Sequence, residues 1–163
     1  MGACDCNLGI NHHCAQPNQG LTKDRFVLYG QGYGSIPVCN LTFHSSNAYT
    51  LLLPSKIILE NPVAHSDFLV SNATQLNIPS SYVSDVSFDN IKKIQSAQQP
   101  LLVFLSEYDE KFESSKNGEL LYEYHAGQSK EIHIVVGANH KNLISTFSVV
   151  EFHNILNSFI TNN

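Results

Sequence analysis

The sequence is poor in charged residues and contains no tryptophan. Only 14% of its 163 residues are Asp, Glu, Lys or Arg, against roughly 25% in a typical soluble domain. Because 42% of the residues are apolar, disorder driven by charge is excluded and one domain with a sizeable core is expected. The nine Lys and Arg residues are scattered and the net charge is −5. No basic stripe is available to neutralise phosphates, so nucleic acid is not an expected partner.

Long hydrophobic runs are also missing. The longest apolar stretches are interrupted at Pro54 and Lys56, far short of the roughly 20 residues that cross a bilayer. The N-terminus lacks the positively charged stretch and apolar core of a secretory signal. These absences predict a cytoplasmic protein without a transmembrane helix, in which a disulfide framework is not expected.

Three of the four cysteines lie in an N-terminal segment without hydrophobic periodicity. Residues 1–24 are rich in Gly, Asn, Gln and Cys and are predicted to form a flexible tail. Gly2, Cys4 and Cys6 resemble the start of dually acylated proteins, with myristate on the glycine and palmitate on the thiols. Since stable anchoring needs two lipid chains, this pattern predicts attachment to the cytoplasmic side of a membrane. A metal site built from the cysteines and histidines of the tail is the competing interpretation, but its spacings match no common zinc pattern.

From Arg25 onward, short apolar runs alternate with helical patterns. This alternation indicates an α/β fold with a parallel sheet of about four strands flanked by helices. Strands are predicted at residues 26–29, 56–60, 100–105 and 131–136, and helices at about 35–53, 87–97, 114–125 and 143–161. Residues 61–86 fit neither period and are predicted to form an irregular, cap-like excursion within a domain spanning residues 25–163.

A glycine-rich turn follows the first predicted strand and has two interpretations. One is a dinucleotide-binding fingerprint, in which Gly30-x-Gly32-x-x-Ser35 holds a pyrophosphate and Glu60 binds a ribose. The other is a nucleophile elbow, G-x-S-x-G, in which a strained turn between a strand and a helix presents a catalytic serine. In the second interpretation Gly32 stands where the serine belongs.

Two downstream segments favour the nucleophile elbow. Asp109 follows the third predicted strand and His140 the fourth, the order in which acid and base follow the nucleophile in enzymes with this elbow. Residues 25–161 resemble the C-terminal part of an α/β-hydrolase, most closely the branch of α/β-hydrolase-domain proteins that remove palmitate from membrane-associated proteins. The resemblance is carried by RFVLYGQGYGSIPV, PLLVFLSEYDE and IVVGANHKNLI.

The resemblance implies a catalytic triad without its nucleophile. Asp109 matches the triad acid, His140 the triad base and Gly32 the nucleophilic serine, and the backbone N–H of Tyr33 matches one oxyanion-hole donor. Because Gly32 has no hydroxyl to acylate, we expect a truncated, degenerate palmitoyl-protein-hydrolase-like protein that binds an acylated protein or lipid-like ligand. An active acyl or thioester hydrolase and the dinucleotide-binding module remain the alternatives. No cofactor and no metal are expected.

Other residues near these motifs receive lesser roles. Ser35 is expected to be a helix residue that points away from the acyl pocket, and Glu107 and Glu110 are less favoured candidates for the acid than Asp109. The segment 26–29 is predicted to be an unpaired sheet edge, because no earlier strand is found in the sequence. An edge of this kind invites pairing with the tail, a second copy of the chain or a partner chain.

Overall fold

The computed structural model describes residues 26–47, 53–85 and 87–162, which form one parallel sheet flanked by helices. The four strands pair in parallel, which confirms the predicted α/β fold class, and they follow one another across the sheet in chain order. They are β1 (Val27–Gln31), β2 (Lys56–Glu60), β3 (Leu101–Tyr108) and β4 (Lys130–Asn139).

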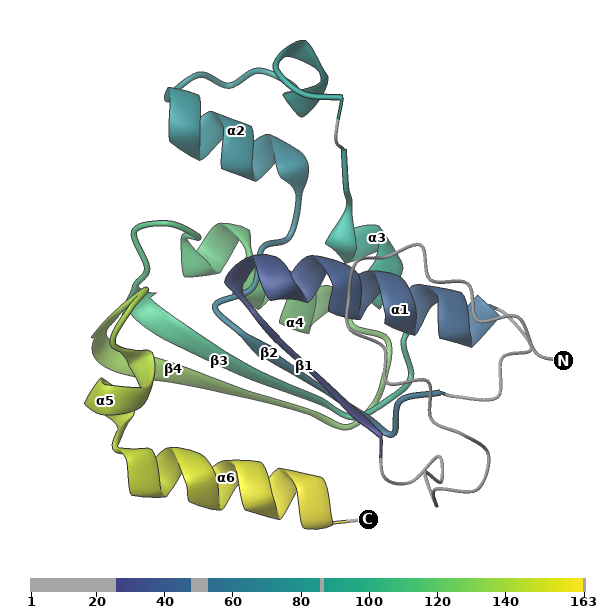
Figure 1. The fold of residues 1–163 in the computed structure, drawn as a ribbon, viewed down its shortest axis with the longest axis vertical. Helices are drawn as coiled ribbons and strands as arrows, with labels where there is room; N and C mark the ends of the chain where they lie inside the picture. Colours follow the sequence, from purple (N-terminus) through teal and green to yellow (C-terminus); the bar gives the residue numbers. More distant parts are fainter. Residues whose placement is uncertain (1–25, 48–52, 86, 163) are drawn as a thin grey trace, which may run out of the picture.

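Alternate residues of the central strands are buried against opposite layers of helices. Ile57 and Leu59 of β2 belong to one apolar cluster, whereas Ile58 belongs to the other. This two-sided burial explains why β2 and β3 are continuous apolar runs. Figure 1 shows α1 (Ser35–Asn47), α3 (Asn90–Ile94) and α4 (Gly118–Tyr124) on one face of the sheet, and α5 (Leu143–Phe147) and α6 (Val149–Thr161) on the other.

The predicted helix over residues 143–161 is interrupted by a change of backbone direction. Ser148 separates α5 from α6 and has a φ of 79°, in the left-handed region. The spacing of apolar residues predicts one continuous helix, because it carries no information about the backbone conformation of a single residue such as Ser148.

The segment expected to be irregular, residues 61–86, contains a helix. α2 (Ser66–Thr74) is followed by a short 3-10 turn, η3 (Ser80–Tyr82), and both project beyond α1 and α3 in Figure 1. His65 caps α2, since its Nδ1 accepts a hydrogen bond from the backbone N–H of Asp67 at 3.0 Å. The apolar residues of α2 are consecutive rather than spaced along one helix face, so periodicity did not predict this helix.

The sheet edges and the surface bear on the predicted partners. Within the described residues β1 pairs only with β2, so the 26–29 segment lies at an edge of the sheet.

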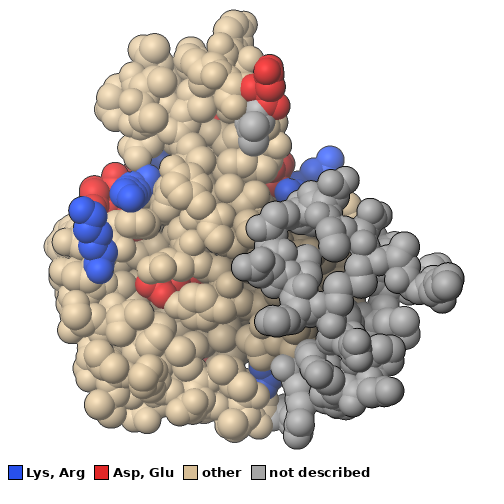
Figure 2. Space-filling view, viewed as in Figure 1, with Lys and Arg blue, Asp and Glu red and all other residues tan. Residues whose placement is uncertain are grey.

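Uncharged residues cover most of the described surface on the face shown in Figure 2. The acylation candidates Gly2, Cys4 and Cys6 lie outside the described residues.

Two structural features are absent from the described ranges. None of the helices there is both long and apolar enough to cross a bilayer. In the same ranges, no three His, Cys, Asp or Glu side chains are grouped so as to hold a metal ion.

His125, at the end of α4, is buried and predicts a pH dependence of stability. It is 3% exposed, and burial, reinforced by the charge of Lys130, lowers the pKa of its imidazole below 6.5. The unfolded chain therefore binds this proton at a higher pH than the folded chain does, and the free energy of unfolding should fall as the pH drops below about 6.5. Urea unfolding of His125→Gln at pH 7.5 and pH 5.5 should show a smaller loss between the two pH values than the unsubstituted protein.

The exposed His44 provides the matched control. His44→Gln should keep the full pH dependence of the unsubstituted protein. An equal loss of stability in His125→Gln and the unsubstituted protein would contradict the role given to His125.

Candidate active site

The glycine turn is a sharp connection between β1 and α1. Gly32–Gly34 form a 3-10 turn, η2, and Gly32 has a φ of 52°, which strains any residue with a Cβ. A Cβ on Gly30 would lie 2.7 Å from the carbonyl oxygen of Gly34 and 2.9 Å from a methyl group of Val38. The turn therefore requires glycine at position 30 for space and favours it at position 32 for conformation.

Gly32 faces His140. A Cβ built on Gly32 would lie 3.8 Å from Cε1 of His140 and 3.3 Å from Cε2 of Phe112. The position that holds the serine in a nucleophile elbow is therefore beside the imidazole, and it carries no side chain.

Asp109 and His140 come together from the ends of β3 and β4. Oδ2 of Asp109 is 2.8 Å from Nδ1 of His140, and the Asp109 side chain is only 1% exposed. The other oxygen, Oδ1, accepts hydrogen bonds from the backbone N–H groups of Lys111 and Phe112, each at 2.8 Å. This geometry assigns the Nδ1 proton to the bond with Asp109 and leaves Nε2 as the nitrogen that can accept a proton.

Side chains at and just after the end of β3 hold the backbone that carries the imidazole. The hydrogen bonds run from Ser106 Oγ to the Asn139 carbonyl at 2.8 Å, from Gly137 N–H to Glu107 Oε2 at 2.9 Å and from His140 N–H to Glu110 Oε2 at 3.2 Å. Because Glu107 and Glu110 bond to backbone N–H groups, Asp109 is the acidic residue here that bonds to the imidazole itself.

Aromatic rings surround the position of the missing hydroxyl. The Phe112 ring lies edge-to-face with the His140 ring and with the Tyr33 ring, at centroid distances of 5.1 Å in both pairs. Tyr33 is 59% exposed. Phe112 could not be recognised as a site residue from the sequence, because a phenylalanine three residues after the acid belongs to no motif. The loop after β3 places the Phe112 ring against Gly32 in the elbow.

Ser35 is buried at the start of α1 and supports the elbow. Its Oγ donates a hydrogen bond to the Gly32 carbonyl at 2.7 Å and accepts one from the Val63 backbone N–H at 3.0 Å. Through these two bonds, the Ser35 hydroxyl links the Gly32 carbonyl in the elbow to Val63, which follows β2. Ser35 is thus engaged with backbone groups and is not the hydroxyl beside His140.

Glu60, the ribose ligand of the dinucleotide interpretation, is engaged with β1. It is 2% exposed, and its two carboxylate oxygens accept hydrogen bonds from the Tyr29 hydroxyl and from Gln31 Nε2, the latter at 2.9 Å. Burial, together with the bond to Glu60, raises the pKa of the Tyr29 hydroxyl. A ribose would have to displace both partners, so the structure gives the dinucleotide interpretation no support.

Comparison with solved structures shows similarity to a lipase, a bromoperoxidase and a carboxylesterase. A monoacylglycerol lipase from Paleococcus ferrophilus is 12% identical, with a TM-score of 0.58 over 83% of this chain and 68% of the lipase. A bromoperoxidase from Bacillus anthracis is 14% identical, with a TM-score of 0.60 over 85% of this chain and 68% of that protein. A carboxylesterase from Lactobacillus plantarum is 13% identical, with a TM-score of 0.60 over 88% of this chain and 62% of the esterase.

These comparisons establish the fold, which is that of the α/β-hydrolases. No family model matches the sequence. No curated protein matches it either. The chain spans only part of each of the three proteins, and at such low identity the similarity concerns architecture alone. The sequence motifs resemble the palmitate-removing branch, but these structures support only the broader α/β-hydrolase fold.

Proposed function

We propose that the protein is a degenerate α/β-hydrolase-like protein that binds an acylated protein or another lipid-like ligand without hydrolysing it. One observation carries the proposal: the residue that faces His140 is Gly32, which has no side chain. Without a hydroxyl there, no acyl-enzyme can form at the elbow. The motifs shared with the palmitate-removing branch support an acyl group as the recognised chemistry.

The proposal extends to where the protein acts. Dual acylation of the tail at Gly2, Cys4 and Cys6 would hold the protein against the cytoplasmic side of a membrane, where acylated proteins are found. The edge of β1 would then pair with a second copy of the chain or with a partner. The scarcity of charge on the face shown in Figure 2 is compatible with such contacts.

A second candidate, residual acyl or thioester hydrolysis, is favoured by the intact hydrogen bond between Asp109 and His140. In that reaction Nε2 of His140 would take a proton from a water molecule whose oxygen attacks the acyl carbonyl carbon. The bond from that carbon to the leaving oxygen or sulfur would then break, and the proton would pass to the leaving group.

Assays with p-nitrophenyl esters and acyl thioesters distinguish the two candidates. We expect no turnover by the purified protein above that of buffer, because the nucleophile is absent. His140→Ala serves as the control, since it removes the base while leaving Gly32 in place. Turnover that His140→Ala abolishes would overturn the binding proposal and establish the hydrolase.

A further inference from the structure

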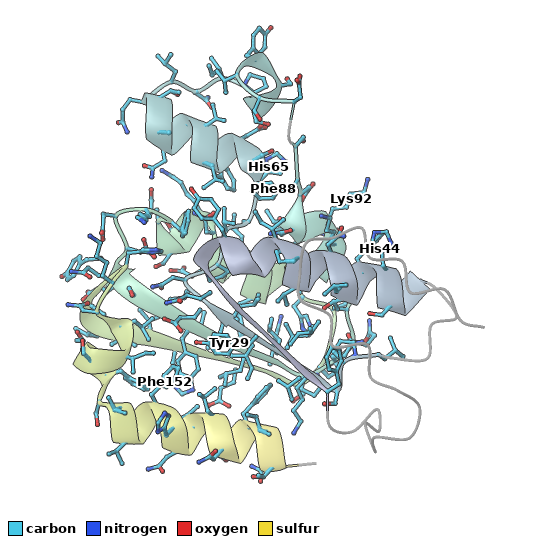
Figure 3. All side chains as sticks on the ribbon, in the orientation of Figure 1. Tyr29, His44, His65, Phe88, Lys92 and Phe152 are labelled. Carbon is cyan, nitrogen blue, oxygen red and sulfur yellow. The ribbon has the colours of Figure 1, made fainter. Side chains whose placement is uncertain are left out.

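An apolar groove begins beside the elbow and runs under α2. Its volume is about 540 Å³, within the roughly 300–1,000 Å³ of pockets that hold small molecules. Tyr33 lines one part of it, so the groove adjoins the position of the missing hydroxyl. Figure 3 shows Phe88 beneath α2. The apolar wall consists of Ile36 and Pro37 of α1, Leu69 and Val70 of α2, and Phe88.

Lys93 of α3 is the only charged side chain among the described residues that line this groove. It is half-buried. Burial raises the pKa of the Cys39 thiol in α1 to about 12, even though the positive charge of Lys93 acts to lower it. Within the described ranges, no salt bridge or hydrogen bond joins the Lys93 ammonium group to an acidic side chain. The groove therefore combines an apolar wall with one cation that has no anionic partner there.

We propose that this groove binds long-chain carboxylates of the fatty-acid type. The carboxylate would lie at the Lys93 ammonium group and the hydrocarbon chain along the apolar wall toward Tyr33. A neutral lipid would leave the half-buried charge uncompensated, whereas a charge-assisted hydrogen bond from Lys93 would stabilise an anionic end. The inference rests on the proposed function, because it names the class of ligand that the protein holds.

The orientation of the ligand follows from the position of the charge. The carboxylate at Lys93 would be held on α3, while His140 lies at the elbow end beyond Tyr33 and Phe112. The carbonyl carbon is then not presented to the imidazole. This arrangement suits retention of a fatty acid and not cleavage of its ester.

Calorimetric titration of the full chain with laurate and with dodecanol, both below their aggregation concentrations, tests the charge directly. Laurate should bind more tightly than dodecanol. Lys93→Met should weaken laurate binding by about 10- to 100-fold, since it removes a hydrogen bond between two charged groups. Dodecanol affinity should change little. The matched control is Lys92→Met, because Lys92 is exposed and lines a different pocket, beside His65.

Three results would overturn the inference. They are equal affinity for laurate and dodecanol, an unchanged laurate affinity in Lys93→Met, and no binding of either compound. A thermal melt confirms that the variant is folded, and Lys93→Gln replaces it if it is not. Failure of this inference is distinguishable from failure of the proposed function, which is measured separately as ester turnover by the unsubstituted protein.

Discussion

Gly32→Ser is expected to react covalently with a fluorophosphonate probe, whereas the unsubstituted protein stays unlabelled. A Cβ at position 32 lies 3.8 Å from Cε1 of His140, so the new hydroxyl would be within reach of the imidazole. The serine oxygen would attack phosphorus, fluoride would leave and Nε2 of His140 would take the proton. Since a positioned base contributes about 10²–10⁴ in rate, labelling should be at least about 100-fold faster than in Gly32→Ser combined with His140→Ala.

The substitution also has a structural consequence. The φ of 52° at position 32 is unfavourable for serine by about 1–2 kcal/mol, and the ring of Phe112 at 3.3 Å must shift slightly. We therefore expect a small fall in melting temperature together with the gained reactivity.

The specificity control for labelling is Gly34→Ser, at a turn position where a Cβ meets no atom within 4 Å. This variant places a hydroxyl two residues away and should not be labelled. Labelling that is equally fast with and without His140, or absent from a folded Gly32→Ser protein, would contradict the orientation of His140 toward position 32. Labelling of the unsubstituted protein that His140→Ala removes would show another nucleophile at the site.

Gly30→Ala is expected to lower the free energy of unfolding by about 2–3 kcal/mol, because overpacking a filled site costs about 1–3 kcal/mol or more. The new methyl group would meet the backbone oxygen of Gly34 at 2.7 Å, and a backbone atom within the elbow cannot move aside without distorting the turn. Urea unfolding followed by circular dichroism measures the change. The melting temperature should fall on the order of 5–10 °C.

Gly34→Ala is the matched control for this steric argument. Gly34 has no neighbour within 4 Å of a built Cβ, and its φ lies outside the left-handed region. Its replacement should leave stability unchanged or raise it by about 0.4–1 kcal/mol through the lower entropy of the unfolded chain. Equal destabilisation by the two alanines would contradict the steric role given to Gly30.

Local patterns predicted the sheet because its two central strands are buried on both faces. The apolar runs ending at Glu60 and at Leu105 correspond to β2 and β3, the two central strands. The C-terminal ends of the strands were predicted less accurately, since β3 and β4 extend to Tyr108 and Asn139, beyond their apolar runs. There the pairing depends on backbone hydrogen bonds, which leave little trace in composition.

The elements that sequence patterns missed depend on single contacts. α2 begins where the His65 imidazole accepts a backbone N–H, and histidine is not among the residues preferred at helix starts. The break between α5 and α6 depends on the left-handed backbone of Ser148, a conformation that serine rarely adopts.

The parallel sheet, the glycine elbow and the absence of a hydroxyl at position 32 could be predicted from the sequence, because they follow from residue types and their spacing along the chain. In contrast, the folded chain was needed to show that Asp109 contacts His140, that Tyr29 bonds to Glu60 and that Lys93 lines an apolar groove. Each of these contacts joins residues from different strands or helices. Their distances depend on how the elements pack, which no local pattern specifies.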